Sequence, residues 1–123
     1  MIEESYVSFD TAKMLKEAGF DEVCRSAYYA TRNSAVMYER NSMLSSGYIS
    51  RPTQALAARW LREKHKIHVG ADMAYSKLVA GKWIYQIRFT DSIGNPYKCV
   101  GWFNNYEEAL EAGLQEAIKL IKK

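Results

Sequence analysis

The sequence predicts an α+β fold: an antiparallel meander of three or four strands packed with a central helix, a C-terminal helix and a short N-terminal helix. Three observations support this class. Residues 52–64 have apolar residues at helical spacing and run directly into a segment that alternates with a period of two. Residues 82–90 alternate in the same way. Residues 105–121 carry a long apolar stripe at helical spacing.

The length of 123 residues predicts one domain over residues 1–123, with a core that needs no disulfide or metal. No segment approaches the roughly 18 apolar residues of a membrane span, and no basic region followed by an apolar one marks a secretory signal. We therefore expect a soluble, cytoplasmic protein that does not contact membranes. Cys24 and Cys99 lie far apart in the sequence and are expected to be free, buried thiols, with a disulfide as the alternative.

A short helix is predicted within residues 7–20, with Ser8 as its cap and Gly19 at its end. Its buried positions would be Ala12, Leu15 and Ala18, with Phe20 closing the end. Residues 21–50 are the least informative. Two segments there favour strands, 27–30 and 35–38, and the turn-like residues between them predict a small hairpin followed by a connecting loop over 41–47.

The central helix is predicted to begin at Pro52, because proline suits the first turn of a helix. Leu56, Trp60 and Leu61 share one stripe, while the other face is basic. The next segment alternates as a strand. Its apolar positions are Ile67, Val69, Ala71, Met73 and Tyr75.

The strongest predicted strand is 82–90, with Trp83, Tyr85, Ile87 and Phe89 on its core face. Turn-forming residues lead into a partner strand over 97–103, where Gly101 is a candidate β-bulge. Asn105 and Glu108 have the spacing of a capping box at the start of the last helix. The apolar stripe of this helix is Tyr106, Leu110, Leu114, Ala117, Ile118 and Ile121. We expect this helix on one face of the sheet and the central helix on the other face or at an edge.

Three segments together resemble small uncharacterised proteins encoded by phages and mobile elements of the Bacteroides group. They are residues 7–20 with Cys24; Pro52-Thr53-Gln54 followed by Trp60-Leu61-Arg62-Glu63, His65 and Ile67; and residues 106–114. Arg51 departs from the small residue expected before Pro52, and residues 25–49 show no match. The resemblance implies a mobile-element origin and brings no catalytic motif.

Sequence patterns typical of enzymes are weak in this chain. His65 and His68 have a spacing that can hold a metal, but the helix is predicted to end between them and no Cys lies near in the sequence. The glutamates at 107, 108 and 111 suit the first turns of a helix, where its dipole favours anions. We therefore predict no catalytic, metal-binding or cofactor-binding residues and no cofactor, with a small enzyme of unknown reaction as the second alternative.

Charge is distributed unevenly along the chain. Residues 1–24 hold two basic against six acidic residues, a net charge of −4, whereas residues 25–98 hold twelve basic against four acidic residues, a net charge of +8. Such asymmetry marks an anionic partner or is neutralised internally when acidic terminal elements fold over the basic centre.

Nucleic-acid binding by the basic residues within 51–98 is therefore one hypothesis. A three-stranded sheet followed by a helix that begins within residues 101–109 resembles, in shape, the arm-binding domains of phage integrases, which present the sheet to DNA. The contacts would come from the sheet face opposite the helix, through Lys82, Gln86, Arg88 and Lys98, and from phosphate contacts by Arg59, Arg62 and Lys66. Ile84, Val100 and Trp102 would make this face apolar for such a role.

The function that the sequence favours is a non-catalytic binding or interaction module, acting through a protein partner or self-association. Its contact surface would be the tyrosine-rich segment between residues 28 and 48, because aromatic residues are enriched at protein interfaces. The candidate contact residues are Tyr28, Tyr29, Tyr38 and Tyr48. The alternative is that these rings cover the sheet.

Overall fold

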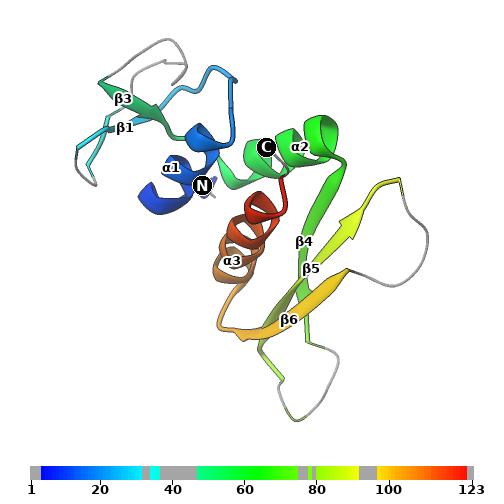
Figure 1. Cartoon of the computed structure of the whole chain (residues 1–123). Coiled ribbons are helices and arrows are strands. Elements are labelled where there is room, and N and C mark those ends of the chain that lie inside the picture. Colours follow the sequence, from blue (N-terminus) through cyan, green and yellow to red (C-terminus); the bar gives the residue numbers. More distant parts are fainter. Residues whose placement is uncertain are drawn as a thin grey trace. The chain divides into compact units, whose positions relative to one another are not determined.

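The computed structural model describes residues 4–31, 34–36, 47–74, 78, 80–91 and 97–121. The chain divides into two compact units, one ending at Ala57 and the other spanning Ala58–Ile121. Each unit holds one three-stranded antiparallel sheet, in the orders β2-β1-β3 and β4-β5-β6 (Figure 1). The predicted α+β class is confirmed. A single domain over the whole chain stays a prediction.

The helices in the described part of the chain are all too short or too polar to cross a membrane.

Helix α1 (Phe9–Glu17) has the ends that the sequence predicts. The Ser8 side chain accepts a hydrogen bond from the backbone N–H of Thr11 at 3.2 Å, so Ser8 is the N-cap. Gly19, at a φ of +92°, adopts the left-handed conformation that ends helices and that glycine tolerates best. Ala12, Leu15 and Phe20 are buried as expected.

The sheet of the first unit consists of β1 (Ala27–Tyr29), β2 (Ala35–Val36) and β3 (Tyr48–Ser50). The antiparallel pair β1–β2 confirms the predicted hairpin. Strand β3 pairs with the other edge of β1 and was not predicted, because three residues are too few to show alternation. Of the loop predicted over 41–47, residues 41–46 lie outside the described residues.

Arg51 ties together three segments of the first unit. Its guanidinium carbon lies 4.1 Å from the centroid of the Tyr6 ring and 5.3 Å from that of Tyr28, both within the range of a cation–π contact. Its Nη1 donates to the Ser26 hydroxyl at 3.1 Å. A small residue at this position would lose all three contacts.

Helix α2 (Gln54–His65) begins two residues later than predicted. Pro52 is still in extended backbone: its carbonyl accepts from the N–H of Val7 at 3.0 Å, and its neighbour Thr53 forms a β-bridge with Tyr6. The Thr53 hydroxyl accepts from the N–H of Leu56 at 3.1 Å, which makes Thr53 the cap. The prediction that Pro52 occupies the first helical turn is therefore wrong.

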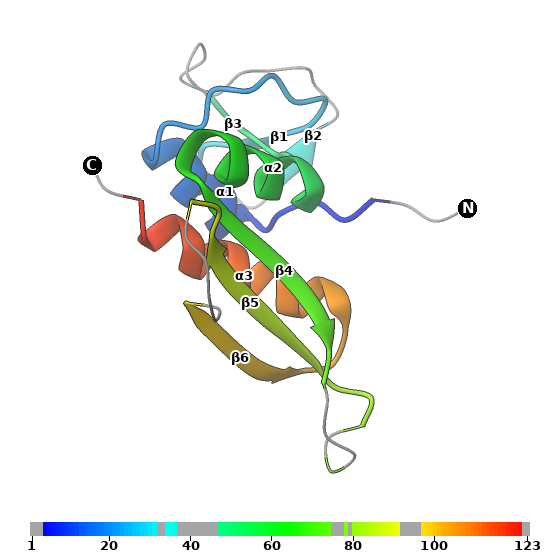
Figure 2. The same cartoon turned by 90° about the vertical axis from the view of Figure 1, so that its right-hand side faces the viewer.

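The second unit contains the predicted meander of β4 (Ile67–Met73), β5 (Trp83–Phe89) and β6 (Lys98–Phe103). Figure 2 shows the three strands side by side. Ile87 pairs with Val69 in β4 and with Lys98 in β6. The register shifts where Ile84 pairs with Gly101 but Trp83 pairs with Phe103, so the predicted bulge at Gly101 is confirmed.

Helix α3 (Tyr106–Lys119) packs across all three strands of this sheet. The Asn105 side chain accepts from the N–H of Glu108 at 2.9 Å, which confirms the predicted cap. Gly113 lies where the helix meets the sheet: a Cβ there would be 2.8 Å from Val69 Cγ1 and 3.1 Å from Tyr85 Cβ. Glycine at this position therefore lets α3 lie close to the sheet. Tyr106, predicted to be in the apolar stripe, is exposed.

Of the helices that the structure describes, only α3 packs across the sheet of the second unit. Of the two places expected for the central helix, the opposite face is wrong, because α2 ends at His65, with only Lys66 between it and the edge strand β4, and does not cross the strands. Its placement at an edge of the sheet stays a prediction. The left-handed backbone of Lys66, at a φ of +58°, makes this abrupt turn from helix to strand.

Replacing Gly113 with alanine should destabilise the protein by about 1–3 kcal/mol, the usual cost of overpacking a core, in spite of the higher helix propensity of alanine. Chemical denaturation of Gly113→Ala would measure this loss. Gly70→Ala is the matched control, because a Cβ at Gly70 would meet only His68 Nε2 at 3.5 Å. Equal stability of Gly113→Ala and wild type would contradict the close approach.

Candidate nucleic-acid interface

The sheet of the second unit has one face covered by α3 and an opposite face, here called the open face. Figure 2 shows α3 behind the strands, with the open face toward the viewer. The register places on this face residues that alternate with the helix-facing ones. They are His68, Gly70, Asp72, Ile84, Gln86, Arg88, Cys99 and Gly101.

Two of the predicted residues of this face point the other way. Lys98 and Val100 pair with Ile87 and Tyr85, which belong to the helix-facing row. The predicted place of Lys98 on the face opposite the helix is therefore wrong, because the strand register turns its side chain toward α3. The same register removes Val100 from the open face, which makes that face less apolar than the sequence suggested.

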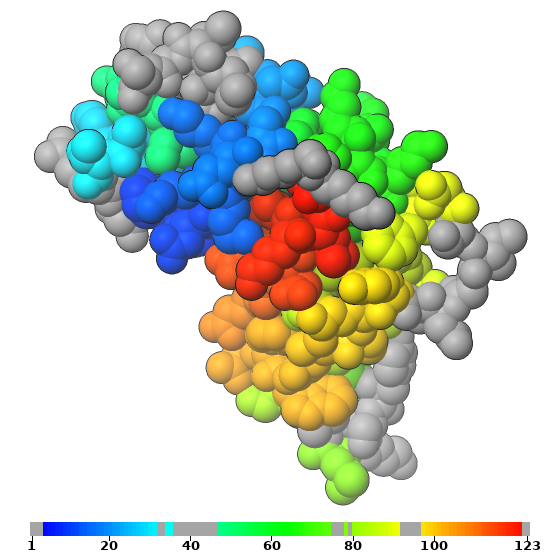
Figure 3. Space-filling model, in the orientation of Figure 1, coloured from blue at the N-terminus to red at the C-terminus, as the bar shows by residue number. Residues whose placement is uncertain are grey.

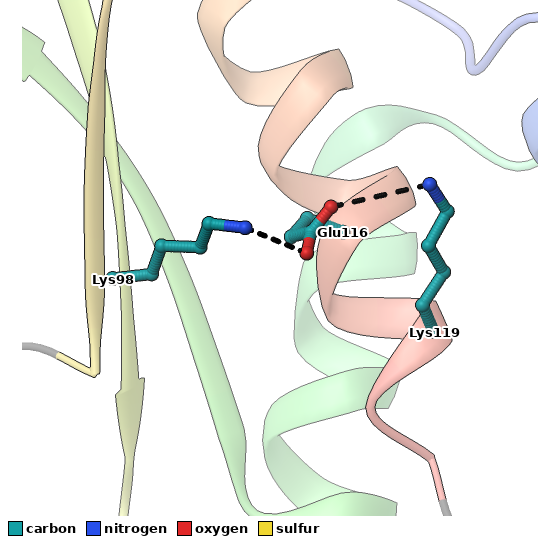
Figure 4. Close-up of polar contacts among 3 residues, drawn as sticks. All are labelled: Lys98, Glu116 and Lys119. Carbon is teal, nitrogen blue, oxygen red and sulfur yellow. Dashed lines mark hydrogen bonds and ion pairs between the residues drawn. The ribbon is translucent and has the colours of Figure 1, made fainter.

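The Lys98 ammonium instead forms an ion pair with Glu116 of α3, with Nζ 2.8 Å from Oε1 (Figure 4). This hydrogen bond lowers the pKa of the Glu116 carboxyl and raises the pKa of Lys98. Lys119 also faces Glu116, at 4.0 Å. The space-filling view shows α3, orange to red, against β6 (Figure 3). Glu116, near the C-terminus, thus neutralises one positive charge of the basic segment 25–98.

Gln86 and Arg88 are next to each other on the open face of β5, and His68 pairs with Arg88 from the neighbouring strand. The side chains of His68 and Arg88 are exposed, and that of Gln86 is half-buried. All three carry hydrogen-bond donors. The structure thus places on one face the two β5 residues that were predicted as nucleic-acid contacts. It adds His68, whose spacing from His65 suggested only metal binding.

Gly70 pairs with Gln86 and has no packing reason to be glycine. Its backbone needs no positive φ, and an added Cβ would make only an ordinary contact with the His68 ring. Gly113 and Gly101 differ, because a Cβ there would lie 2.8 Å from Val69 and 3.0 Å from Ile84. A glycine inside a strand costs stability and often marks the close approach of a ligand or another backbone.

The remaining predicted phosphate contacts and Lys82 have different surroundings. Arg59 forms an ion pair with Glu63 one helical turn away. Arg62 and Lys66 are exposed, and the carbonyl of Lys66 accepts from the N–H of Thr90, two residues beyond Arg88. Lys82 donates to the Asn104 side chain at 2.7 Å, which places it at the start of α3. Lys66 is therefore the cation best placed beside Arg88.

The other end of the open face carries two apolar residues and one acidic residue. Ile84 is 3% exposed there, next to Gly101. Trp102 follows in the bulge and is 57% exposed. Asp72, which pairs with Ile84, also lies at this end and is exposed. His68, Gln86 and Arg88 therefore lie together at the end of the face near the start of β4, and a carboxylate lies at the other end.

The tyrosine-rich segment is only partly available for contacts. Tyr28 is 7% exposed, its hydroxyl donates to the carbonyl of Val7 at 2.7 Å, and its ring meets Phe9 edge to face at 5.5 Å. Its predicted role as a protein contact is wrong, because it belongs to the core. Tyr29 and Tyr48 are half-buried, with ring centroids 5.6 Å apart. Tyr38 lies outside the described residues.

Side chains that could support catalysis or metal binding are dispersed. Over the ranges that the structure describes, no three His, Cys, Asp or Glu residues gather as metal ligands. His65 packs on the Trp60 ring at 4.7 Å, and burial lowers its pKa. Both cysteines are free thiols, as predicted. Cys24 is buried as expected, whereas Cys99 is exposed, so the expected burial is wrong for Cys99.

Burial raises the pKa of the Cys24 thiol to about 11, from an ordinary value of 9.0. We expect one thiol per native chain to react rapidly with a thiol reagent at pH 8, and the second only after unfolding. The Cys99→Ser variant should lose the rapid reaction. Because the folded pKa is raised, the stability that Cys24 contributes is complete below pH 9 and is lost between pH 9 and about 11. Rapid labelling of both native thiols would contradict this burial.

Replacing Tyr28 with phenylalanine removes the hydroxyl that donates to Val7 and leaves a buried carbonyl without that donor. The expected loss of unfolding free energy is about 1–3 kcal/mol, measured by denaturation. Tyr48→Phe is the control, because Tyr48 is half-buried beside Tyr29, and it should change stability less. If Tyr28→Phe were as stable as wild type, Tyr28 would return as a candidate surface residue.

In comparisons with known protein families, curated proteins and solved structures, the chain matches none. Its predicted mobile-element origin therefore stays a prediction.

Proposed function

We propose that this protein is a non-catalytic module that binds duplex DNA through the open face of the β4-β5-β6 sheet. The observation that carries the proposal is the arrangement of Gln86, Arg88 and His68 around Gly70 on the face without a helix. Arginine and glutamine are the side chains that bind guanine and adenine edges with two hydrogen bonds each.

The dimensions of the sheet suit the major groove of DNA. Neighbouring strands lie about 4.8 Å apart, so the outer backbones of a three-stranded sheet are about 10 Å apart. The major groove of B-DNA is about 12 Å wide and admits a two-stranded β-ribbon, so β5 with its neighbour β4, which together carry Gln86, Arg88 and His68, are the strands that would enter it. The major groove of A-form RNA is too narrow for side chains to reach the bases, so double-stranded RNA is a poorer candidate.

Apart from the carboxylate of Asp72 at one end of the open face, the charges favour the same orientation. The first turn of α3, on the covered side, carries the exposed acidic residues Glu107 and Glu108, which would repel phosphate. The last turn of α2 is basic, with Arg62 and Lys64, and Lys66 follows it. Phosphate contacts supply most of the sequence-independent affinity for DNA, and these cations would make them on either side of the groove.

Duplex binding should weaken steeply between 50 and 200 mM salt, the behaviour expected when counterions are released from phosphates. Lys66→Gln should lower the affinity for every duplex to a similar extent and reduce the slope of log K against log salt by about 1. The measurement is fluorescence anisotropy with a labelled duplex of mixed sequence.

Lys119→Gln is the matched control, because it makes the same substitution at an exposed lysine on the α3 side. It should leave both affinity and slope close to those of the wild type. Equal effects of the two substitutions, or no binding at low salt, would reject the proposed interface. Binding to single strands in preference to duplex would also reject it.

A further inference from the structure

We infer that Gln86 and Arg88 recognise two bases in the major groove, an adenine and a guanine separated by one base pair. This inference rests on the proposed function and adds sequence specificity to it.

The first step is the spacing of the two side chains. They are two residues apart on one strand and on one face, so their backbone positions are about 6.8 Å apart. The bases of one DNA strand are stacked about 3.4 Å apart, so two residues of β5 span two base steps. A strand lying along the groove therefore presents Gln86 and Arg88 to bases that are not adjacent but have one base between them.

The second step is chemical selectivity. An arginine guanidinium donates two hydrogen bonds to O6 and N7 of guanine, and a glutamine amide pairs with N6 and N7 of adenine. Neither arrangement fits another base equally well. The pair therefore favours a guanine and an adenine with any base between them.

The third step is access. Gln86 is flanked across the sheet by Gly70 on β4 and by Cys99 on β6, two small residues. At Gly70 no side chain covers the backbone, although neither a positive φ nor a tight contact requires glycine at this position. A larger residue there would stand beside Gln86 and keep the base edge away from it. We therefore assign to Gly70 the role of admitting the DNA to the Gln86 side chain.

The test is selection of duplexes from a pool with a randomised centre by the full-length protein, followed by affinity measurements on the enriched sequence. We expect enrichment of a guanine and an adenine separated by one position. Arg88→Ala should lose the preference for guanine and keep that for adenine, and Gln86→Ala should do the reverse. Each loss should lower the affinity for the selected duplex roughly 5- to 150-fold, the range of one bidentate base contact.

A second variant separates the role of Gly70 from folding. Gly70→Val should melt no lower than wild type within a few degrees, because valine favours strands, and yet should lose the adenine preference. Lys119→Gln should keep the full sequence preference. The melting temperature of every variant shows that it is folded.

The outcomes distinguish this inference from the proposed function. Salt-sensitive duplex binding without any enriched sequence would overturn the recognition by Gln86 and Arg88 while leaving DNA binding intact. Enrichment that persists unchanged in Gln86→Ala and Arg88→Ala would overturn it as well, because other residues would then read the bases. Absence of duplex binding at low salt would overturn both.

Discussion

The close approach of α3 to its sheet is the constraint on which the rest of the second unit depends. Gly113 allows the helix backbone to reach Val69 and Tyr85, and a Cβ would already be too close to both. Ile67, Val69, Tyr85 and Ile87 of the helix-facing row are buried, and this is where hydrophobic burial stabilises the unit. Because the helix takes one face of the sheet, the polar residues of the other row remain on the open face.

The bulge at Gly101 decides which residues of β6 belong to each side. It lets Phe103 face the Tyr85 ring, at a centroid distance of 5.8 Å, while Gly101 itself lies on the opposite face beside Ile84. Lys98 consequently faces α3 and pairs with Glu116. The charge pattern predicted that acidic terminal elements neutralise the basic centre of the chain, and the ion pair of Lys98 with Glu116 is one such contact. Arg88 and Lys66 lie at other positions of the second unit.

The first unit depends on a different interaction, the stacking of a cation between tyrosines. Arg51 contacts Tyr6 and Tyr28 and donates to Ser26, so it joins the N-terminal segment to β1. Tyr28 also binds Val7 through its hydroxyl. Tyrosines that suggested a contact surface in the sequence therefore serve in part as core, because a ring with a satisfied hydroxyl can be buried.

Local spacing along the chain predicts the α+β class, the meander and the bulge. Backbone chemistry at helix ends predicts the caps at Ser8 and Asn105 and the glycine that ends α1. The sequence also places Gln86 and Arg88 on one face, since alternation within a strand is local. Tertiary contacts alone decide that β3 joins β1, that Thr53 forms a bridge with Tyr6, and that Lys98 faces α3. These depend on pairing between residues distant in the sequence and on strand register, where a shift of one residue exchanges the two faces.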